Sequence, residues 1–358
     1  MKKNRRILMT VAIVLILLIV IPLVFWVILS RGSIRSYSGE NSLSEKFVMD
    51  INGAPNGFFI NSKDTDNPVL LLVSSGPGTD DYFLTDKYKD MDLEDDFTVV
   101  YWDYRGCGIA YDRNVDINEI TLDNLINDTH EVTGYLKERF SREKIFLMGF
   151  SGGSKIAINV AQMYPEDYYA YIGMAQCVTD SYENDTLMYG FMKKTFEANG
   201  DTRSLKKLED SVEHIDDHVK CKNWRDYVDL VHEAGGGTIK DKSEFTGIII
   251  PIFTCRCYTV REKLNYVPSL KMYDKAPIAD EIKNYDYREE ITSLDIPAYF
   301  ISGEYDYNCP WELVEDYCDG LKAPDKGFYL IPDSAHSPLW ENPEKTCDIL
   351  KSIKEKLV

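Results

Sequence analysis

The pentad Gly-Phe-Ser-Gly-Gly at residues 149–153 is the stretch of this sequence whose residue types most clearly predict chemistry. It follows the short apolar run 144–148 and opens the apolar-periodic run 154–163, a succession that predicts a strand, a sharp turn and a helix. On such a turn, flanking glycines let the helix start close to the strand, and the serine hydroxyl stays exposed above the sheet. We therefore interpret Ser151 as a nucleophile; the alternative is a glycine-rich turn with an incidental serine.

A serine hydroxyl becomes an effective nucleophile when a histidine accepts its proton and a carboxylate orients that histidine. Asp306 follows the predicted buried strand 296–303, where an orienting acid belongs. His336 lies in a loop between a further predicted strand and a C-terminal helical stretch. The chain order Ser151, Asp306, His336 is that of α/β-hydrolases and differs from the orders in chymotrypsin-like and subtilisin-like proteases. These three residues are the predicted catalytic triad.

An oxyanion hole needs backbone N–H groups held at the reacting carbonyl. The residue after the nucleophile, Gly152, is one predicted donor, and the loop 74–78 after a continuous apolar strand supplies the other. Gly76 is the first choice within that loop and Ser75 the second, because Pro77 has no N–H to donate. The alternative for this loop is a simple Gly-Pro turn.

Strand-like and helix-like runs alternate through residues 46–178 and resume near Ile296, which predicts a mostly parallel, doubly wound α/β sheet. Between these two parts the pattern changes to charged, helix-like segments, which predicts a helical cap. We expect a cytoplasmic N-terminus at 1–6, a transmembrane anchor at 7–29, a tether at 30–45, the first part of the α/β-hydrolase core at 46–178, the cap at 179–287 and the second part of the core at 288–358.

The predicted anchor rests on an uncharged apolar run of 23 residues, 7–29, which as a helix of ~1.5 Å per residue matches a hydrocarbon core of ~30 Å. A cleaved signal peptide would have a shorter apolar core and a small-residue cleavage site. Four basic residues precede the run and two follow it, so the positive-inside rule predicts a cytoplasmic N-terminus and an extracellular catalytic domain.

Beyond the triad, the chain resembles the proline iminopeptidase group of α/β-hydrolases, serine aminopeptidases that remove N-terminal residues, commonly proline. The resemblance covers most of residues 46–358. The loop 74–78 of this chain is similar to the family's His-Gly-Gly-Pro-Gly, but it has serine at the first two positions. The residue after the nucleophile, usually Trp in the family, is Gly152 here. The other matching segments are 103–108, Asp-Tyr-Arg-Gly-Cys-Gly, the loop from Tyr305-Asp306 to Cys309-Pro310, and Ala335-His336-Ser337.

The resemblance implies an aminopeptidase acting on short peptides, with an esterase or small-amide hydrolase as the alternative and a catalytically silent binding module as a further one. No metal or organic cofactor is expected. An aminopeptidase must pair the substrate's ammonium with a carboxylate. The resemblance places this recognition in the cap, and Glu183, just after the strand-to-cap transition, is the candidate.

The charge pattern disfavours nucleic acid as a partner. The formal charge is −19, and the residues after the four basic ones at the front sum to −23. The expected partners are a small peptide or acyl substrate and, through residues 7–29, a lipid bilayer; the oligomeric state stays open.

The remaining candidates in the sequence are weaker. Eight cysteines form no evident disulfide framework, although Cys107 and Cys309 both lie in family-like loops, where a bridge or a thiol pair is one option. His214 and His218 are spaced i, i+4 on a predicted cap helix, where a solvated polar face is favoured over a metal site. The glycine run 235–237 is predicted to be a flexible cap loop rather than a phosphate cradle.

Overall fold

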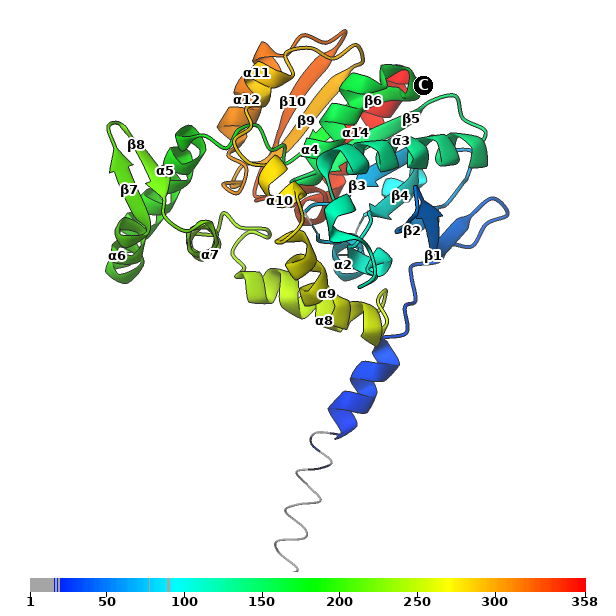
Figure 1. The fold of residues 1–358 in the computed structure, drawn as a ribbon, viewed down its shortest axis with the longest axis horizontal. Coiled ribbons are helices and arrows are strands. Elements are labelled where there is room, and N and C mark those ends of the chain that lie inside the picture. The colour runs from blue at the N-terminus through cyan, green and yellow to red at the C-terminus, as the bar shows by residue number, and fades with distance from the viewer. Residues whose placement is uncertain (1–15, 17, 19, 77, 89–90) are drawn as a thin grey trace, which may run out of the picture.

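The computed structural model describes residues 16, 18, 20–76, 78–88 and 91–358 (Figure 1). Within these residues, eight strands form one sheet in the order β1-β2-β4-β3-β5-β6-β9-β10. β1 pairs antiparallel with β2, and β2 with β4, whereas the other neighbours are parallel. The strands are β1 (Leu43–Ile51), β2 (Ala54–Ser62), β3 (Val69–Val73), β4 (Thr98–Asp103), β5 (Ile145–Phe150), β6 (Tyr168–Met174), β9 (Ala298–Gly303) and β10 (Lys326–Ile331).

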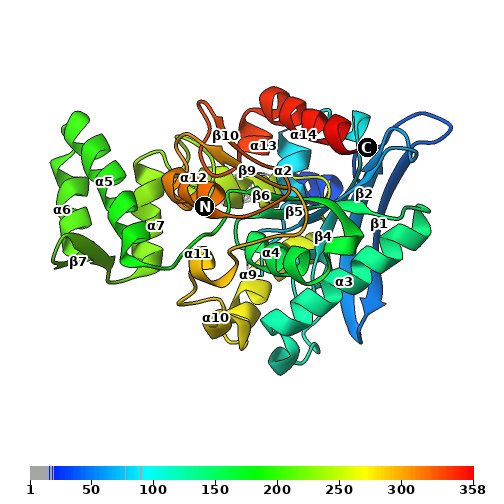
Figure 2. The ribbon, with the colours of Figure 1, turned by 90° about the horizontal axis from the view of Figure 1, so that it is seen from above.

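Helices cover both faces of this sheet, as Figure 2 shows, so the central strands are apolar on both sides. Alternate residues of a strand enter opposite cores. Leu71 packs in the core beneath α3 (Leu122–Arg139) and α4 (Gly153–Met163), and Leu72 in the core beneath α14 (Pro343–Leu357). The expected mostly parallel sheet of an α/β-hydrolase is therefore present, with an antiparallel edge at β1 and β2.

Short helices connect the main elements of the core. They include α2 (Tyr82–Lys87) after β3 and α13 (Pro338–Glu341) after β10. The others are η1 (Leu93–Asp95), η2 (Gly108–Ala110), η3 (Ile117–Glu119), η4 (Pro165–Asp167), α11 (Tyr287–Glu290) and α12 (Trp311–Gly320).

The segment between β6 and β9 holds the elements of the predicted cap. One part, distant from the sheet in Figure 1, has an apolar core of its own, which includes Met188, Phe196 and Tyr227. Its elements are α5 (Tyr182–Ala198), α6 (Thr202–Ser211), β7 (Val212–Ile215), β8 (His218–Cys221) and α7 (Trp224–Glu233). The other part holds η5 (Phe245–Ile249), a π-helical turn, with α8 (Ile250–Thr254), α9 (Val260–Tyr273) and α10 (Ile278–Glu281).

The predicted helix carrying His214 and His218 is wrong. These residues lie on β7 and β8, which pair as an antiparallel hairpin with His214 opposite Val219. The chain turns at Asp216, whose φ of 50° is in the left-handed region that Asp tolerates better than most residues. A histidine spacing of four residues is compatible with a helix, but here the turn residues between them decide the local structure.

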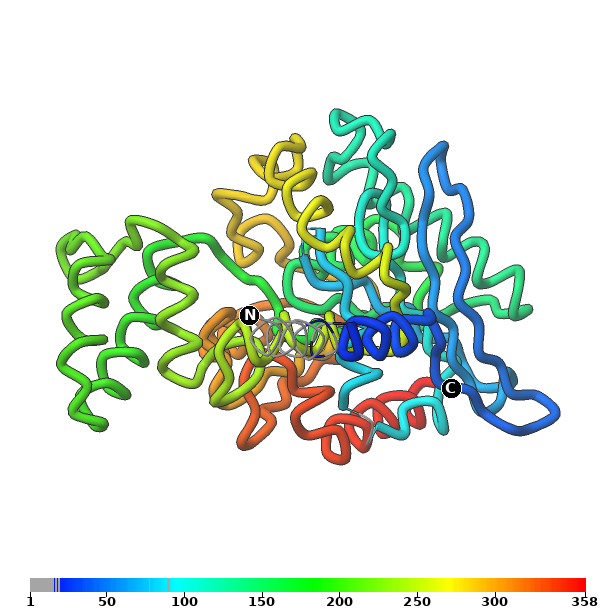
Figure 3. The backbone as a smooth tube through the Cα atoms, turned by 90° about the horizontal axis from the view of Figure 1, so that it is seen from below, coloured from blue at the N-terminus to red at the C-terminus, as the bar shows by residue number. Residues whose placement is uncertain are grey.

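Residues 20–29 form a helix that projects from the molecule, and Figure 3 views the molecule from the side on which it emerges. Part of the predicted anchor, residues 7–15, 17 and 19, lies outside the described residues. Among the residues that the structure does describe, no helix combines the length and apolar character needed to cross a membrane.

Candidate active site

The predicted nucleophile lies on a sharp turn between β5 and α4. Ser151 has a φ of 51°, which is strained for a residue with a side chain. Its N–H donates to the carbonyl of Met174 at 2.9 Å, which holds the turn against the neighbouring strand. A Cβ on Gly149 would lie 2.6 Å from the Cα of Ser154, and one on Gly153 would lie 2.3 Å from the Ser74 carbonyl oxygen. Both flanking positions therefore require glycine for the close strand–helix approach.

The structure brings the three predicted triad residues together. The Nε2 of His336 lies 2.7 Å from the Oγ of Ser151, and its Nδ1 lies 2.9 Å from the Oδ1 of Asp306. With a neutral imidazole, Nδ1–H donates to Asp306 and Nε2 accepts the Ser151 proton, which is the arrangement for general-base catalysis. Asp306 is fully buried, and its Oδ1 also accepts the N–H groups of Asn308 and Cys309.

The pKa of His336 is raised above its ordinary value of 6.5. Burial by itself lowers this pKa, but the negative charge of Asp306 and the hydrogen bond to it outweigh burial. The imidazolium that forms when His336 takes the serine proton is therefore stabilised.

A carboxylate that sequence reasoning missed holds the histidine loop. The Oε1 of Glu341 accepts the N–H groups of Ala335 and Ser337, one on each side of His336, both at 3.0 Å. Its Oε2 accepts the N–H of Lys240 in the cap at 2.7 Å, and burial raises the pKa of Glu341 to about 7. The sequence holds little signal for this role, because Glu341 is one of many acids and lies at the end of a four-residue helix.

The glycine run 235–237 packs between the loops that carry the acid and the base. The N–H of His336 donates to the carbonyl of Gly237 at 3.3 Å, and the N–H of Tyr307 donates to that of Gly236 at 3.4 Å. A Cβ on Gly237 would lie 2.1 Å from the His232 ring. Instead of being only a flexible loop, this run is the cap segment that contacts both loops.

The predicted oxyanion loop lies against the nucleophile turn. A Cβ on Gly152 would lie 1.9 Å from the carbonyl oxygen of Gly76, so glycine is required for the loop to approach this closely. The N–H of Ser75, the second-choice donor, is already occupied because it donates to the Oδ2 of Asp81 at 2.5 Å. For the N–H groups of Gly76 and Gly152, no acceptor is found among the described residues. This leaves these two amides available to an oxyanion.

Asp81 and Tyr104 brace the oxyanion loop through Ser75. The Oδ1 of Asp81 accepts the Ser75 hydroxyl at 2.6 Å, and the Tyr104 hydroxyl donates to the Ser75 carbonyl at 2.7 Å. Burial raises the pKa of Asp81 to about 6. The second serine of this loop, Ser75, is therefore held by a carboxylate six residues further along the chain, whereas the buried Ser74 hydroxyl has no hydrogen-bond partner among the described residues.

The inner face of α9 supports the same loop from the cap. The Ser269 hydroxyl lies 2.9 Å from the carbonyl oxygen of Gly78 and 2.8 Å from that of Gly106. The hydroxyl of Tyr273, one turn further along α9, donates to the Arg105 carbonyl at 2.5 Å. A Cβ on Gly78 would lie 2.8 Å from the Tyr273 ring. The cap is thus in direct contact with the loops around the nucleophile.

A cavity of about 1090 Å³ lies between core and cap and includes Ser151 and His336 in its wall. Both predicted oxyanion residues, Gly76 and Gly152, also line it. Charged side chains in its wall are Asp80, Asp81, Lys155, Asp180, Asp185, Lys220, Asp274 and Lys283. Burial raises the pKa of Asp80 to about 7, and its Oδ1 has no hydrogen-bond partner among the described residues. The site therefore holds carboxylates of its own.

Glu183, the predicted amine-binding residue, is not part of this cavity wall. Its carboxylate accepts from Arg288 at 2.8 Å at the protein surface, and its side chain is 47% exposed. Glu183 does follow the strand-to-cap transition, as expected. On α5, however, its side chain pairs with Arg288 and does not reach the cavity.

Cys309 lies beside Cys177, with their sulfurs 3.5 Å apart, and not beside Cys107. Both thiols line the cavity and both are free. The hydrogen bond from Cys309, helped by the charge of Lys155, lowers the pKa of Cys177. Cys107 is a free thiol buried in the core that α3 and α4 cover.

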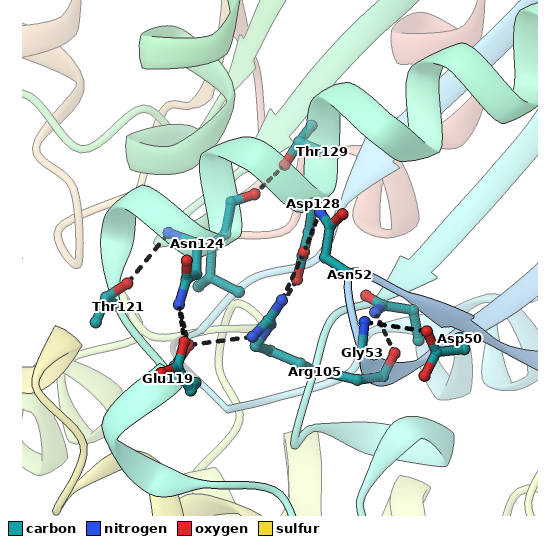
Figure 4. A network of polar contacts seen from close by, with 12 residues as sticks. Asp50, Asn52, Gly53, Arg105, Glu119, Thr121, Asn124, Asp128 and Thr129 are labelled. Atoms are coloured by element: carbon teal, nitrogen blue, oxygen red, sulfur yellow. Dashed lines mark hydrogen bonds and ion pairs between the residues drawn. The ribbon is translucent and has the colours of Figure 1, made fainter.

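Arg105, from the family-like segment 103–108, is part of a polar network outside the catalytic cavity (Figure 4). Its guanidinium makes two hydrogen bonds to Asp128 of α3, at 2.6 and 2.7 Å, and a third to the Glu119 carbonyl at 3.3 Å. Asn52 donates to the same Asp128 at 3.0 Å. A hollow of about 420 Å³ adjoins this network and shares no lining residue with the catalytic cavity. Arg105 therefore fixes its loop and does not contact the reacting groups.

Comparison with known proteins agrees with this geometry. Residues 89–231 match the model of the family "Serine aminopeptidase, S33". The chain is 29% identical over 310 residues to a probable aminopeptidase, YbaC, of Bacillus subtilis, covering 85% of this chain and 94% of that protein. It is 22% identical over 301 residues to the proline iminopeptidase of Saccharolobus solfataricus, covering 81% of this chain and 86% of that protein.

Solved structures share the fold at lower identity. A proline iminopeptidase-related protein from Thermus thermophilus superposes with a TM-score of 0.57 at 19% identity, covering 88% of this chain and 99% of the other. The proline iminopeptidase of Mycobacterium smegmatis gives a TM-score of 0.58 at 14% identity, covering 87% and 98%. In its sheet order, in the arrangement of Ser151, His336 and Asp306 and in these matches, the chain is similar to the S33 serine aminopeptidase family of α/β-hydrolases.

Proposed function

We propose that this protein is a serine aminopeptidase that releases the N-terminal residue of short peptides. The observation that carries the proposal is a cavity that holds both the Ser151–His336 pair and buried carboxylates able to pair with a substrate ammonium. A buried ammonium is costly unless a carboxylate pairs with it, whereas an ester substrate needs no such group. The names of the similar proteins agree with this class of substrate.

The reaction begins when Ser151 attacks the carbonyl carbon of the first residue. His336 accepts the hydroxyl proton and then gives it to the leaving amine, while Asp306 keeps the imidazole oriented. The N–H groups of Gly76 and Gly152 donate to the oxyanion. Water, activated by the same histidine, then hydrolyses the acyl-enzyme. Each step uses groups of the chain itself, and none requires a cofactor.

Asp80 is the carboxylate that we assign to the substrate amine. It is 94% buried, lies in the cavity wall four residues after Gly76, and has an oxygen without a partner among the described residues. Burial and the neighbouring charge of Asp81 raise the pKa of Asp80 to about 7, as expected for a poorly solvated carboxylate. An arriving ammonium would restore the missing stabilisation of that charge. Asp81, by contrast, is occupied by Ser75.

Acetylation of the substrate amine tests the proposal. We expect the acetylated peptide to show a kcat/KM at least ~100-fold lower, which corresponds to about 2.7 kcal/mol of lost pairing. Asp80→Asn should cause a similar loss for free-amine substrates but little change for acyl esters. Glu183→Gln is the matched control, because that carboxylate lies outside the cavity.

Equal turnover of free and acetylated peptides, or activity restricted to acyl esters, would favour the esterase alternative. A binding module without catalysis would not be labelled by a fluorophosphonate probe. For the proposed enzyme, we expect labelling that disappears in Ser151→Ala.

We also propose that residues 7–29 anchor the enzyme in the cell membrane, with the N-terminus cytoplasmic and the catalytic domain extracellular. Support comes from the uncharged apolar run and from the excess of basic residues ahead of it. External protease on wall-free cells should release a domain that begins within residues 30–44. A secreted form starting near Arg31 would contradict the anchor, and protection from protease would contradict the orientation.

A further inference from the structure

The outer face of α9 is exposed and carries apolar and basic residues at regular positions. Its exposed positions Arg261, Leu264, Val267 and Lys271 follow each other at helical spacing, with apolar residues between two basic ones. The side chains of Leu264 and Val267 are 58% and 48% exposed. This is the pattern of a helix at a membrane surface, where apolar groups enter the acyl boundary and basic groups stay at the headgroups.

The neighbouring segment extends this surface. Phe245 of η5 is 62% exposed and Ile250 of α8 is 38% exposed. We call Phe245, Ile250, Leu264 and Val267 the apolar edge. Apart from the buried Lys263, the stretch 242–271 that contains it carries four basic residues and two acidic ones, in a protein whose formal charge is −19. The local excess of positive charge favours an anionic partner.

The apolar edge adjoins the place where the N-terminal helix leaves the molecule (Figures 1 and 3). The indole N–H of Trp26 donates to the carbonyl of Phe253 in α8 at 2.7 Å. The buried ammonium of Lys263 in α9 donates to the Ser30 hydroxyl at 2.7 Å and to the Cys255 carbonyl at 2.6 Å. These contacts fix the end of the N-terminal helix to the same two helices that form the edge.

We propose that the apolar edge lies in the interface of the membrane that residues 7–29 enter, and that its occupant is an anionic lipid surface. The proposal rests on the anchor proposed above. Phe25 and Ile28, in the last turns of the N-terminal helix, are 60% and 45% exposed. Exposed apolar side chains thus continue from this helix onto the edge, and one lipid surface can cover both.

The elements that carry the apolar edge also line the catalytic cavity. Ile248 of η5 and Tyr266 of α9 line the cavity, and Ser269 on the inner face of α9 contacts Gly78 of the oxyanion loop. Docking of α8 and α9 on lipid therefore holds the cap at the position where it supports this loop.

Photo-crosslinking in lipid nanodiscs tests the proposal with the full chain. Nanodiscs of phosphatidylglycerol and phosphatidylethanolamine would carry the protein with p-benzoylphenylalanine replacing Phe245 or Leu264. Val48 and Met163 are the matched controls, because they are 49% and 54% exposed but lie on β1 and at the end of α4. Phe25 reports on the anchor itself. We expect lipid adducts at 25, 245 and 264 that exceed those at 48 and 163 by about tenfold or more.

The outcomes separate the two proposals. Adducts at 25 but not at 245 or 264 would overturn the lipid-bound edge and leave the anchor intact. Absence of adducts at 25 would overturn both. Crosslinks at 264 between two copies of the chain would mean that the edge is a dimer contact and would likewise reject a lipid occupant. A second variant, Leu264→Glu, should reduce adducts at 245 while those at 25 stay unchanged; unchanged adducts at 245 would contradict a shared surface.

Discussion

The carbonyl oxygen of Gly76 occupies the space that a side chain on Gly152 would need, because a Cβ there would lie only 1.9 Å from it. The backbone of the oxyanion loop thus rests directly on the residue after the nucleophile. A side chain at position 152 is therefore incompatible with the loop as it lies here. The close approach of Gly76 and Gly152 therefore sets where an oxyanion can be held.

Gly152→Ala should therefore impair catalysis by displacing this loop. We expect kcat to fall by about 10²–10³, the usual effect of losing one oxyanion donor. Gly134→Ala is the control, since a Cβ at that exposed position of α3 meets nothing within 4 Å. It should keep normal activity and raise the free energy of unfolding by about 0.5–1 kcal/mol. Steady-state kinetics and thermal unfolding give both readouts, and a fully active Gly152→Ala would contradict the assigned hole.

The triad residues should behave as one unit. Ser151→Ala and His336→Ala should each lower kcat by at least ~10³, and Asp306→Asn by about 10³–10⁴, because the histidine then adopts the wrong tautomer. Circular dichroism should show an intact fold in each variant. Near-normal turnover in any of the three would remove that residue from the mechanism.

The pH dependence of kcat/KM should report the raised pKa of His336. The base must be neutral, so kcat/KM should decline as the pH falls through a value above 6.5. Asp306→Asn removes the charge that raises this pKa, so the acid limb of its residual activity should move to lower pH. In the wild type, the same raised pKa contributes stability that is fully present below 6.5 and is lost as the pH rises through the folded-state value. An acid limb that stays in place in Asp306→Asn would argue against His336 as the titrating base.

Glu341 should act as a positioning residue for His336. Glu341→Ala leaves the N–H groups of Ala335 and Ser337 without their acceptor, which should cost about 1–3 kcal/mol of stability for each buried group. The resulting small displacement of the histidine loop should lower kcat by up to about 10², while KM changes less. Glu341→Gln keeps one acceptor oxygen and should recover part of kcat.

Glu355→Gln, at an exposed position of α14, is the matched control for these variants and should match the wild type in both kinetics and unfolding. If Glu341→Ala lost stability but retained full kcat, Glu341 would have a structural role only.

Local patterns in the sequence were sufficient for the sheet class and for the identity of the reacting residues. Ser151, Asp306 and His336 could be recognised because each follows a strand-like run, and parallel strands bring their carboxyl ends to one edge of the sheet. The glycines around Ser151 follow from the same local geometry, since the strand and helix that they join are neighbours in the chain.

Contacts between distant segments were decided only by the tertiary structure. Glu341 holds both sides of His336 and a cap residue, Asp81 takes up both donors of Ser75, and Glu183 faces Arg288 instead of the cavity. Each of these carboxylates is one acid among 59 in the chain, so its type carries little information. Sequence periodicity reports which face of an element is buried, whereas the partner that a polar side chain meets depends on how cap and core pack together, which no local pattern encodes.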